Sequence, residues 1–322
     1  MPVVETSELR RTFTARTGAF TRHKREIEAV CGITFSIERG ELFGLLGPNG
    51  AGKTTTIKML ITLLLPTSGS ARVLGLDVVS HARDVRRHIG YAFGGDRGLY
   101  DRLSGTDNPR YFAELYGVPP RTQRTRIAEL IELVGLRGRE NDRVEVYSRG
   151  MRQRLHIARA LMHDPDVLFL DEPTTGIDPV GARELRATIA GLLTQGKTIL
   201  LTTHYMFEAD ELCDRIAVIR SGEVVAQGTP QDLKQRVSSG SVVEIEAFGA
   251  TGRAIDAIRR LRGVRSVTVE ERDQVHVLHV RVAPDAEVTP AILAELSSAR
   301  IGRIESREPT LEDAYVELVS GG

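Results

Sequence analysis

The sequence has 322 residues, of which 41% are hydrophobic and 27% are charged, a composition typical of a folded chain with one middle-sized domain and a smaller one. Lysine and arginine together number 43, as do aspartate and glutamate, so the basic excess of proteins that bind nucleic acid through its phosphates is missing. The cysteines, Cys31 and Cys213, lie far apart without metal-like spacing, which excludes a disulfide framework.

Apolar stretches are short throughout the sequence. The longest one, at 59–65, falls far short of the roughly 20 residues that cross a bilayer. The amino terminus also lacks the charged and apolar regions of a secretory signal. We therefore predict no transmembrane segment and no signal peptide, so any membrane role is expected to be peripheral.

The first predicted elements follow a basic, polar insertion at 15–24, which we interpret as a solvated hairpin or as a contact for lipid phosphates or a partner. Short strands are predicted at 33–37 and 42–46, and a glycine-rich loop follows the second strand. Behind that loop, apolar residues recur with the spacing of one helix face and end before Pro66: Ile57, Leu60, Ile61 and Leu64.

Farther along the chain, helical spacing returns at 121–136. Two short apolar runs, at 167–170 and 198–201, predict strands. Strands that alternate with helices predict an α/β fold with a mostly parallel sheet.

A small polar stretch at 238–241 predicts a boundary between one domain at 1–237 and a second at 238–322. Beyond it, the periodicity gives the order β-α-β-β-α-β of a ferredoxin-like α+β domain. The predicted elements are a strand at 243–247, a helix at 255–261, strands near Val267 and at 275–282, a helix at 292–296 and a strand at 301–304. A last helix carries one apolar face, made by Leu311, Ala314, Tyr315 and Leu318.

The glycine-rich loop carries the strongest motif, because residues 47–54 read Gly-Pro-Asn-Gly-Ala-Gly-Lys-Thr and fit the phosphate-loop pattern. Glycines let successive backbone N–H groups point at phosphate, and the following helix adds the positive end of its dipole. In this pattern Lys53 reaches the β- and γ-phosphates, and the Thr54 hydroxyl binds Mg²⁺. The alternative interpretation is a glycine turn with a surface lysine.

The apolar run at 167–170 ends in two carboxylates, Asp171 and Glu172, where the carboxyl edge of a sheet meets its ligand. Such a pair suits phosphoryl transfer, with Asp171 holding Mg²⁺ through water and Glu172 deprotonating the attacking water. The alternative is an acidic cap on a helix that begins after Pro173.

Between these motifs, residues 147–151 read Tyr-Ser-Arg-Gly-Met. The stretch resembles the signature of ABC ATPases, in a variant associated with exporters whose ATPase and membrane halves are separate chains. The resemblance implies that Ser148 and Gly150 contact the γ-phosphate of ATP held by a second copy of the chain. The local alternative is a Ser-capped helix with a basic exposed face.

The resemblance covers 3–237 and implies a P-loop ABC ATPase domain with a helical subdomain at about 95–146. It implies Mg²⁺ and ATP as cofactors, with the nucleotide held by Gly47, Pro48, Asn49, Gly50, Ala51, Gly52, Lys53, Thr54 and Thr55. Gly176-Ile177-Asp178-Pro179 matches the family's D-loop, with Asp178 near the nucleotide, and His204 after the strand at 198–203 matches its switch histidine. Catalysis is then assigned to Glu172, His204 and Lys53.

Two parts of the family pattern are altered. After Ile89-Gly90-Tyr91 the family carries a glutamine that touches Mg²⁺, whereas this chain reads Ala-Phe-Gly-Gly-Asp. We interpret Asp96 as a substitute metal ligand or as a solvated residue after a flexible Gly-Gly turn. For the aromatic ring that stacks on adenine, Phe13 is the best positional match and Phe20 a second candidate.

The resulting prediction is an ATP-hydrolysing subunit that powers export through an integral membrane permease at the cytoplasmic face of the membrane. It is expected to work as a homodimer around ATP, with the segment at 95–146 docked on the permease and no nucleic acid as partner. Two alternatives are an ABC ATPase that acts on nucleic acid or ribosomes and a degenerate binding protein that does not hydrolyse ATP. The cargo is not encoded in this chain, because the membrane subunit selects it.

Overall fold

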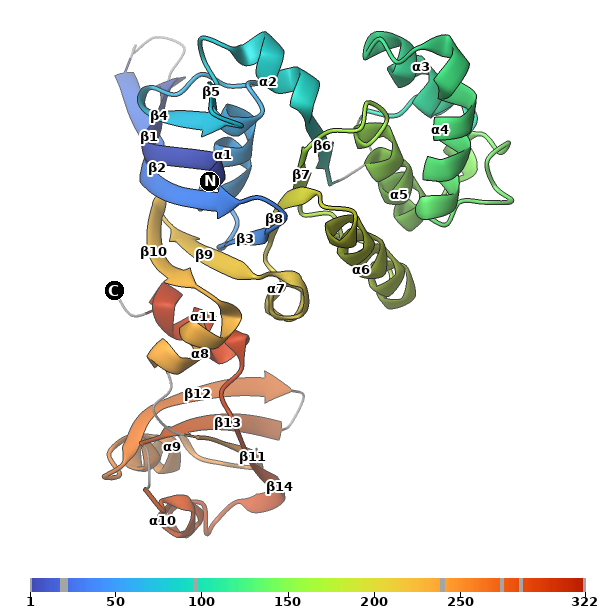
Figure 1. Ribbon diagram of the computed structural model, residues 1–322. Coiled ribbons are helices and arrows are strands. Elements are labelled where there is room, and N and C mark those ends of the chain that lie inside the picture. The colour runs from blue at the N-terminus through green and yellow to red at the C-terminus, as the bar shows by residue number, and fades with distance from the viewer. Residues whose placement is uncertain are drawn as a thin grey trace. The chain divides into compact units, whose positions relative to one another are not determined.

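The computed structural model of the protein describes residues 2–17, 23–94, 98–237, 241–272, 275–283 and 286–320. The chain divides into two compact units, Met1–Pro230 and Gln231–Gly322. The predicted boundary at 237/238 lies slightly farther along, beside residues outside the described part. Figure 1 shows the elements of both units.

The first unit opens with an antiparallel sheet in the order β2-β1-β4-β5. Its strands are β1 (Pro2–Thr17), β2 (His23–Glu38), β4 (Ser68–Val73) and β5 (Leu76–Asp77). β1 and β2 pair as far as Thr17 and His23, so the strand predicted at 33–37 is only the end of a much longer one. The part of β2 before residue 33 is mostly polar, so its sequence shows no regular apolar alternation from which a strand could be predicted. Phe20 lies outside the described residues.

The second sheet of this unit has the order β10-β9-β3-β8-β7-β6. Its strands are β3 (Leu42–Leu46), β6 (Ile89–Phe93), β7 (Val167–Asp171), β8 (Thr198–Thr203), β9 (Arg215–Arg220) and β10 (Glu223–Gly228). All neighbours run parallel except β10, which is antiparallel to β9. The mostly parallel sheet is thus confirmed. β3, β7 and β8 are buried along their whole length, as their unbroken apolar runs predict.

The helix after the glycine-rich loop, α1 (Lys53–Leu60), is shorter than its apolar spacing predicts. Thr62 adopts a left-handed conformation with φ of 65°, and the N–H groups of Leu63 and Leu64 both bond to the Lys58 carbonyl. These bonds close the helix before Pro66 is reached, so the prediction of its end was wrong.

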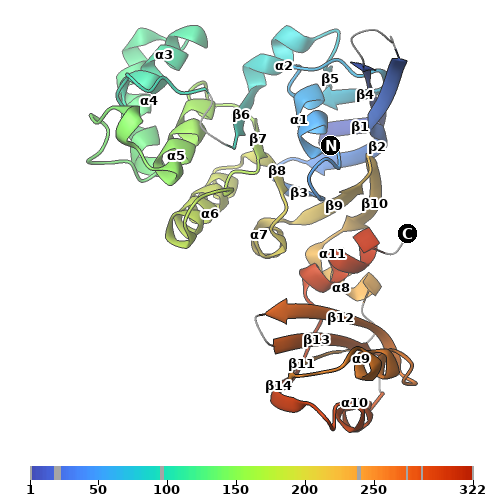
Figure 2. The same cartoon turned by 180° about the vertical axis from the view of Figure 1, so that it is seen from behind.

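The other helices of the unit are α2 (Ala82–His88), α3 (Asp107–Leu115), α4 (Pro120–Leu133), the 3₁₀ turn η1 (Val144–Val146), α5 (Arg149–Ala160), α6 (Pro179–Thr194) and α7 (Met206–Leu212). α4 matches the helix predicted at 121–136. α3, α4 and α5 contact one another and form a helical group beside β6 (Figure 2). Among all helices in the described ranges, none is long and apolar enough to cross a membrane.

The second unit begins within α8 (Pro230–Val237), at Gln231, and has the predicted β-α-β-β-α-β order. Its elements are β11 (Val242–Phe248), α9 (Gly252–Arg259), β12 (Val264–Arg272), β13 (Val275–Val282), α10 (Thr289–Glu295), β14 (Arg300–Arg307) and α11 (Leu311–Ser320). The sheet is antiparallel in the order β12-β13-β11-β14. α9 and α10 pack on one face of it through a common apolar core.

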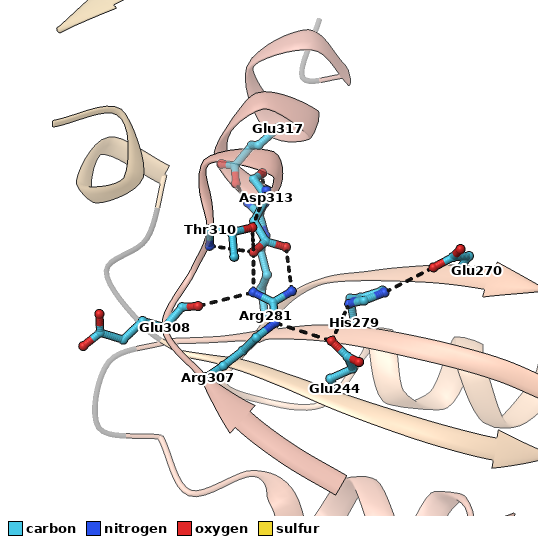
Figure 3. Close-up of polar contacts among 9 residues, drawn as sticks. All are labelled: Glu244, Glu270, His279, Arg281, Arg307, Glu308, Thr310, Asp313 and Glu317. Atoms are coloured by element: carbon cyan, nitrogen blue, oxygen red, sulfur yellow. Dashed lines mark hydrogen bonds and ion pairs between the residues drawn. The ribbon is translucent and has the colours of Figure 1, made fainter. Parts of the chain in front are cut away.

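The opposite face of this sheet is polar, because side chains alternate along each strand. There the start of α11 is held by two arginines, as Figure 3 shows. Arg307 of β14 bonds to both carboxylate oxygens of Asp313, at 2.6 and 3.3 Å. Arg281 of β13 bonds to the Glu317 carboxylate and to the Asp313 carbonyl. The helix is therefore fixed to the sheet by ionic contacts as well as by the buried Leu311 and Ala314.

Candidate active site

The glycine-rich loop at 47–52 connects the buried strand β3 to α1 and is shaped by two glycines with positive φ, Gly50 and Gly52. A Cβ at Gly52 would lie 2.5 Å from the Ala29 carbonyl, and one at Gly47 would lie 2.3 Å from the Ile219 carbonyl. The loop thus needs glycine for both conformation and close approach, and it opens directly into the first turn of α1.

Lys53, the first residue of α1, points back into this loop. Its Nζ donates to the carbonyls of Gly47, at 2.6 Å, and Pro48, at 3.3 Å, and it lies 3.3 Å from Glu172 Oε1. The side chain is only 4% exposed, which rules out the alternative of a surface lysine. A buried ammonium held by carbonyls and one carboxylate is ready to bind anionic phosphate oxygens.

Asp171, at the end of β7, is bound by two hydroxyl groups. Thr54 Oγ1 donates to its Oδ2 at 2.8 Å, and Thr202 Oγ1 donates to its Oδ1 at 2.5 Å. The carboxylate is thereby joined to both α1 and β8. Thr54 and Asp171 supply neighbouring hard oxygen atoms of the kind that Mg²⁺ prefers, so this pair fits the predicted metal.

Glu172 follows in a left-handed conformation with φ of 50°, which is uncommon for a residue with a side chain. Its backbone N–H donates to the carbonyl and the hydroxyl oxygen of Thr202, both at 3.0 Å. Its Oε2 accepts from Thr175 Oγ1 at 3.3 Å and lies 3.3 Å from His204 Nδ1. The fold thus brings Lys53 and His204, which were predicted from distant parts of the sequence, to the carboxylate of Glu172.

A cavity of 530 Å³ opens beside these groups. It is lined by Asn49, Thr54, Gly94, Arg149, Gln153, Asp171, Glu172, Thr175, Gly176 and Ile177. The lining combines the glycine-rich loop, the paired carboxylates and the first turns of α5. Of the remaining loop residues, Ala51 is buried and Thr55 is half-buried on α1.

The segment predicted as the signature forms the start of α5. Ser148 is its N-cap and accepts from the Met151 N–H at 3.2 Å, so the Ser-capped helix of the alternative interpretation is present. The preceding Tyr147 is buried, its hydroxyl donates to the Arg139 carbonyl at 2.7 Å, and burial raises its pKa to about 12. Ser148 itself is exposed, whereas Gly150 is buried against Ile177.

Asp178 is the N-cap of α6. Its Oδ1 accepts from the N–H groups of Val180, at 3.1 Å, and Gly181, at 3.0 Å. The bond from Gly181 is the main cause of a lowered pKa of Asp178. Capping alone accounts for an aspartate here, so its contact with nucleotide stays a prediction.

The altered segment after β6 lies close against the end of β7. The Gly94 N–H donates to the Asp171 carbonyl at 2.8 Å, and a Cβ at Gly94 would lie 2.8 Å from the Glu172 carbonyl. Position 94 therefore has no room for a side chain in this conformation. Asp96, the predicted substitute ligand, lies outside the described residues.

Phe13, predicted to stack on adenine, lies on β1 and is 38% exposed. The Arg11 guanidinium carbon lies 4.7 Å from the centre of its ring. The ring is not part of the wall of the 530 Å³ cavity, so its contact with adenine stays a prediction.

Sequence reasoning missed two kinds of residue here. Thr175 donates to the Glu172 carboxylate and Thr202 to the Asp171 carboxylate. The only sequence signal for them is that polar residues follow the apolar runs of their segments. Gln153 of α5 lines the cavity. It was not predicted as a site residue, because it lies among the arginines that follow the signature.

Comparison with known proteins places these features in one family. Residues 30–175 match the ABC transporter family, and residues 228–319 match the family described as ATP-binding protein DrrA1-3-like, C-terminal domain. The linearmycin resistance ATP-binding protein LnrL of Bacillus subtilis is 37% identical over 90% of this chain and 93% of its own length. The daunorubicin/doxorubicin resistance ATP-binding protein DrrA of Streptomyces peucetius is 42% identical, over 85% and 82% of the two chains.

A solved structure gives the same answer for the fold. That of cbiO1 from Clostridium perfringens, part of the ABC transporter complex cbiONQ, aligns with a TM-score of 0.62 and 26% identity. The alignment covers 73% of this chain and 94% of cbiO1. The predicted P-loop ATPase fold is confirmed by this likeness.

Proposed function

The chain belongs to the ATP-binding subunits of ABC transporters, and from this premise we propose that two copies of it close around ATP and drive export through a separate membrane permease. ATP hydrolysis is the activity of the family. The observation that supports this site for it is that Lys53 and His204 both contact the Glu172 carboxylate, which lines one cavity together with Asp171.

The residues of this chain divide the work of hydrolysis. Lys53 leaves Glu172 and binds the terminal phosphates when ATP enters, because a phosphate oxygen competes with a carboxylate for the same ammonium. Glu172 is then free to accept a proton from the attacking water. His204, close to Glu172 Oε2, is in position to contact the terminal phosphate and to respond to its loss.

Thr54 and Asp171 would hold Mg²⁺, which neutralises charge on the phosphates when it is bound. The bond from Thr202 keeps the Asp171 carboxylate oriented toward Thr54. Ser148 and Gly150 of the second copy would face the same ATP, since the N-terminal end of α5 is suited to an anion.

The permease is proposed to dock in a groove of 840 Å³ on the first unit. Arg83, Arg86 and Arg87 of α2 line it together with Leu115 and Tyr116 at the end of α3, the start of α4 and the segment after α5. Leu115 is 63% exposed there. An amphipathic segment with acidic residues would suit the arginines and apolar side chains of this groove. The chain is then proposed to work at the cytoplasmic face of the membrane.

Replacement of Leu115 by lysine tests this function. In vesicles that contain the permease, the Leu115→Lys variant should lose ATP-driven export and copurification, because an exposed apolar contact is removed, while the purified chain keeps its own ATP turnover. Leu65→Lys is the matched control, since Leu65 is 62% exposed and lies outside the groove. Normal export by Leu115→Lys would contradict the proposed docking site. If wild-type vesicles export none of the drugs named in the relatives, the proposed export function is contradicted.

The cargo is proposed from the relatives alone. Linearmycin and daunorubicin or doxorubicin appear in the names of two of them, so these compounds are the first cargo to test.

A further inference from the structure

Gln153 is a buried amide on the wall of the nucleotide cavity. It lies one helical turn after Arg149 on α5, and both side chains face the cavity because residues four apart share one side of a helix. Only 4% of Gln153 is exposed. Its Nε2 is buried and has no hydrogen-bond partner within the described parts of the chain.

An unpartnered buried amide is unfavourable, and proteins seldom keep one without a use. The two carboxylates of the same cavity have their partners elsewhere within the chain. Asp171 accepts from Thr54 and Thr202, while Glu172 faces Lys53, His204 and Thr175. The amide thus has an unmet capacity to donate at a place where anionic oxygens of a ligand would arrive.

We propose that the Gln153 side chain donates a hydrogen bond to the terminal phosphate of ATP bound at this site. Gly94 lines the same cavity and contributes no side chain to it. The Nε2 and Oε1 positions exchange by rotation about the last side-chain bond, so the donor can turn toward the phosphate.

This contact contributes more to catalysis than to binding. Charge spreads over the oxygens of the terminal phosphate during transfer, and a fixed donor in a site from which water is excluded stabilises that charge. Because Gln153 lies on the helix that Ser148 caps, closure of the dimer on Ser148 also bears on the position of the amide. The inference rests on ATP hydrolysis at this site, and wild-type turnover in the same experiment tests that premise separately.

The test compares two buried glutamines. Gln153→Met keeps the size of the side chain and removes the amide. Gln123→Met is the matched control, because Gln123 is 6% exposed on α4 and its Nε2 donates to Glu114 Oε1 and to the Val118 carbonyl, both at 2.9 Å. Turnover, unfolding temperature without nucleotide, and affinities for ADP and for a non-hydrolysable ATP analogue are measured for the full-length chain.

For Gln153→Met we expect a fall in kcat of about 100-fold, the usual cost of one lost donor to transition-state charge. The analogue should bind more weakly while ADP binds as before, and the unfolding temperature should stay equal or rise, because an unpaired polar group is removed. Gln123→Met should unfold at a lower temperature and keep its kcat.

Three results would overturn the proposal: normal kcat in Gln153→Met, equal weakening of ADP and analogue, or a lowered unfolding temperature that accompanies the loss of activity. Gln153→Asn provides a second variant, with a polar side chain one carbon shorter. It should fold like the wild type and lose affinity for the analogue, and unchanged affinity would contradict the contact. If the wild type itself shows no turnover, the ADP-to-analogue comparison still decides the role of Gln153.

Discussion

At the scale of single residues, the site depends on a few close backbone contacts. The Gly94 N–H bonds to the Asp171 carbonyl, and this contact ties β6 to the residue that precedes Glu172. A side chain at position 94 would push against the Glu172 carbonyl, 2.8 Å from its Cβ. The geometry of the proposed base thus depends on a glycine at position 94.

Replacement of Gly94 by alanine should therefore cost about 1 to 3 kcal/mol of unfolding free energy, the usual penalty for overpacking, and reduce turnover by displacing Glu172. Gly191→Ala is the matched control, because no atom lies within 4 Å of its added Cβ and it lies inside α6. That variant should be stabilised by up to about 1 kcal/mol with unchanged turnover. Denaturant unfolding and phosphate release measure both effects, and a Gly94→Ala variant as stable and active as the wild type would contradict the close contact.

Residues whose role lies in a local pattern could be predicted from the sequence. Lys53 and Thr54 are fixed by the spacing of the phosphate loop, and Asp171 by the end of a buried strand. The unpaired state of the Gln153 amide among the described residues could not be predicted, because whether an amide is paired depends on residues that only folding brings near.

At the scale of elements, α11 shows how charge fixes a helix. Burial opposes ionisation of Asp313, but bonds from Arg307 and Thr310 outweigh it and lower the pKa of Asp313. A carboxylate whose pKa is lowered by folding stabilises the folded state above its unfolded pKa of about 3.9, and this contribution is lost as the pH falls through its lowered pKa.

The Asp313→Asn variant should lose about 1.5 to 3 kcal/mol of local stability at pH 7, the value of hydrogen bonds to a charged group. The difference from the wild type should shrink as the pH falls below about 4, because the wild-type carboxyl is then protonated as well. Hydrogen exchange of the α11 amides at several pH values measures this. Glu312→Gln, an exposed change on the same turn, is the control, and a difference that stays constant at low pH would contradict the ionic clamp.

Element prediction succeeded where burial leaves a pattern in the sequence. β3 and β7 were predicted within a residue or two from unbroken apolar runs, and β13 was predicted equally well. The length of β1 and β2 was not predicted, because their outer parts show no regular apolar alternation, although the antiparallel pairing up to Thr17 and His23 agrees with the interpretation of 15–24 as a hairpin. α1 ends early through a left-handed Thr62, which no periodicity signals.

At the scale of the whole molecule, the chain combines an ATPase unit and a smaller α+β unit, each with a core of its own. The fold class could be predicted because the phosphate loop and the β-α-β-β-α-β order each specify an architecture. The function of the smaller unit could not be predicted, because its sequence contains no catalytic motif.

The most direct test of the central claim is phosphate release from Mg²⁺-ATP by the purified chain and by its Glu172→Gln variant, with the dimeric state of the variant followed by light scattering. The account predicts turnover by the wild type, a loss of at least about 100-fold in the variant, and a stable ATP-bound dimer, because the base is removed while Lys53 still binds phosphate. Turnover by Glu172→Gln at the wild-type rate would contradict it.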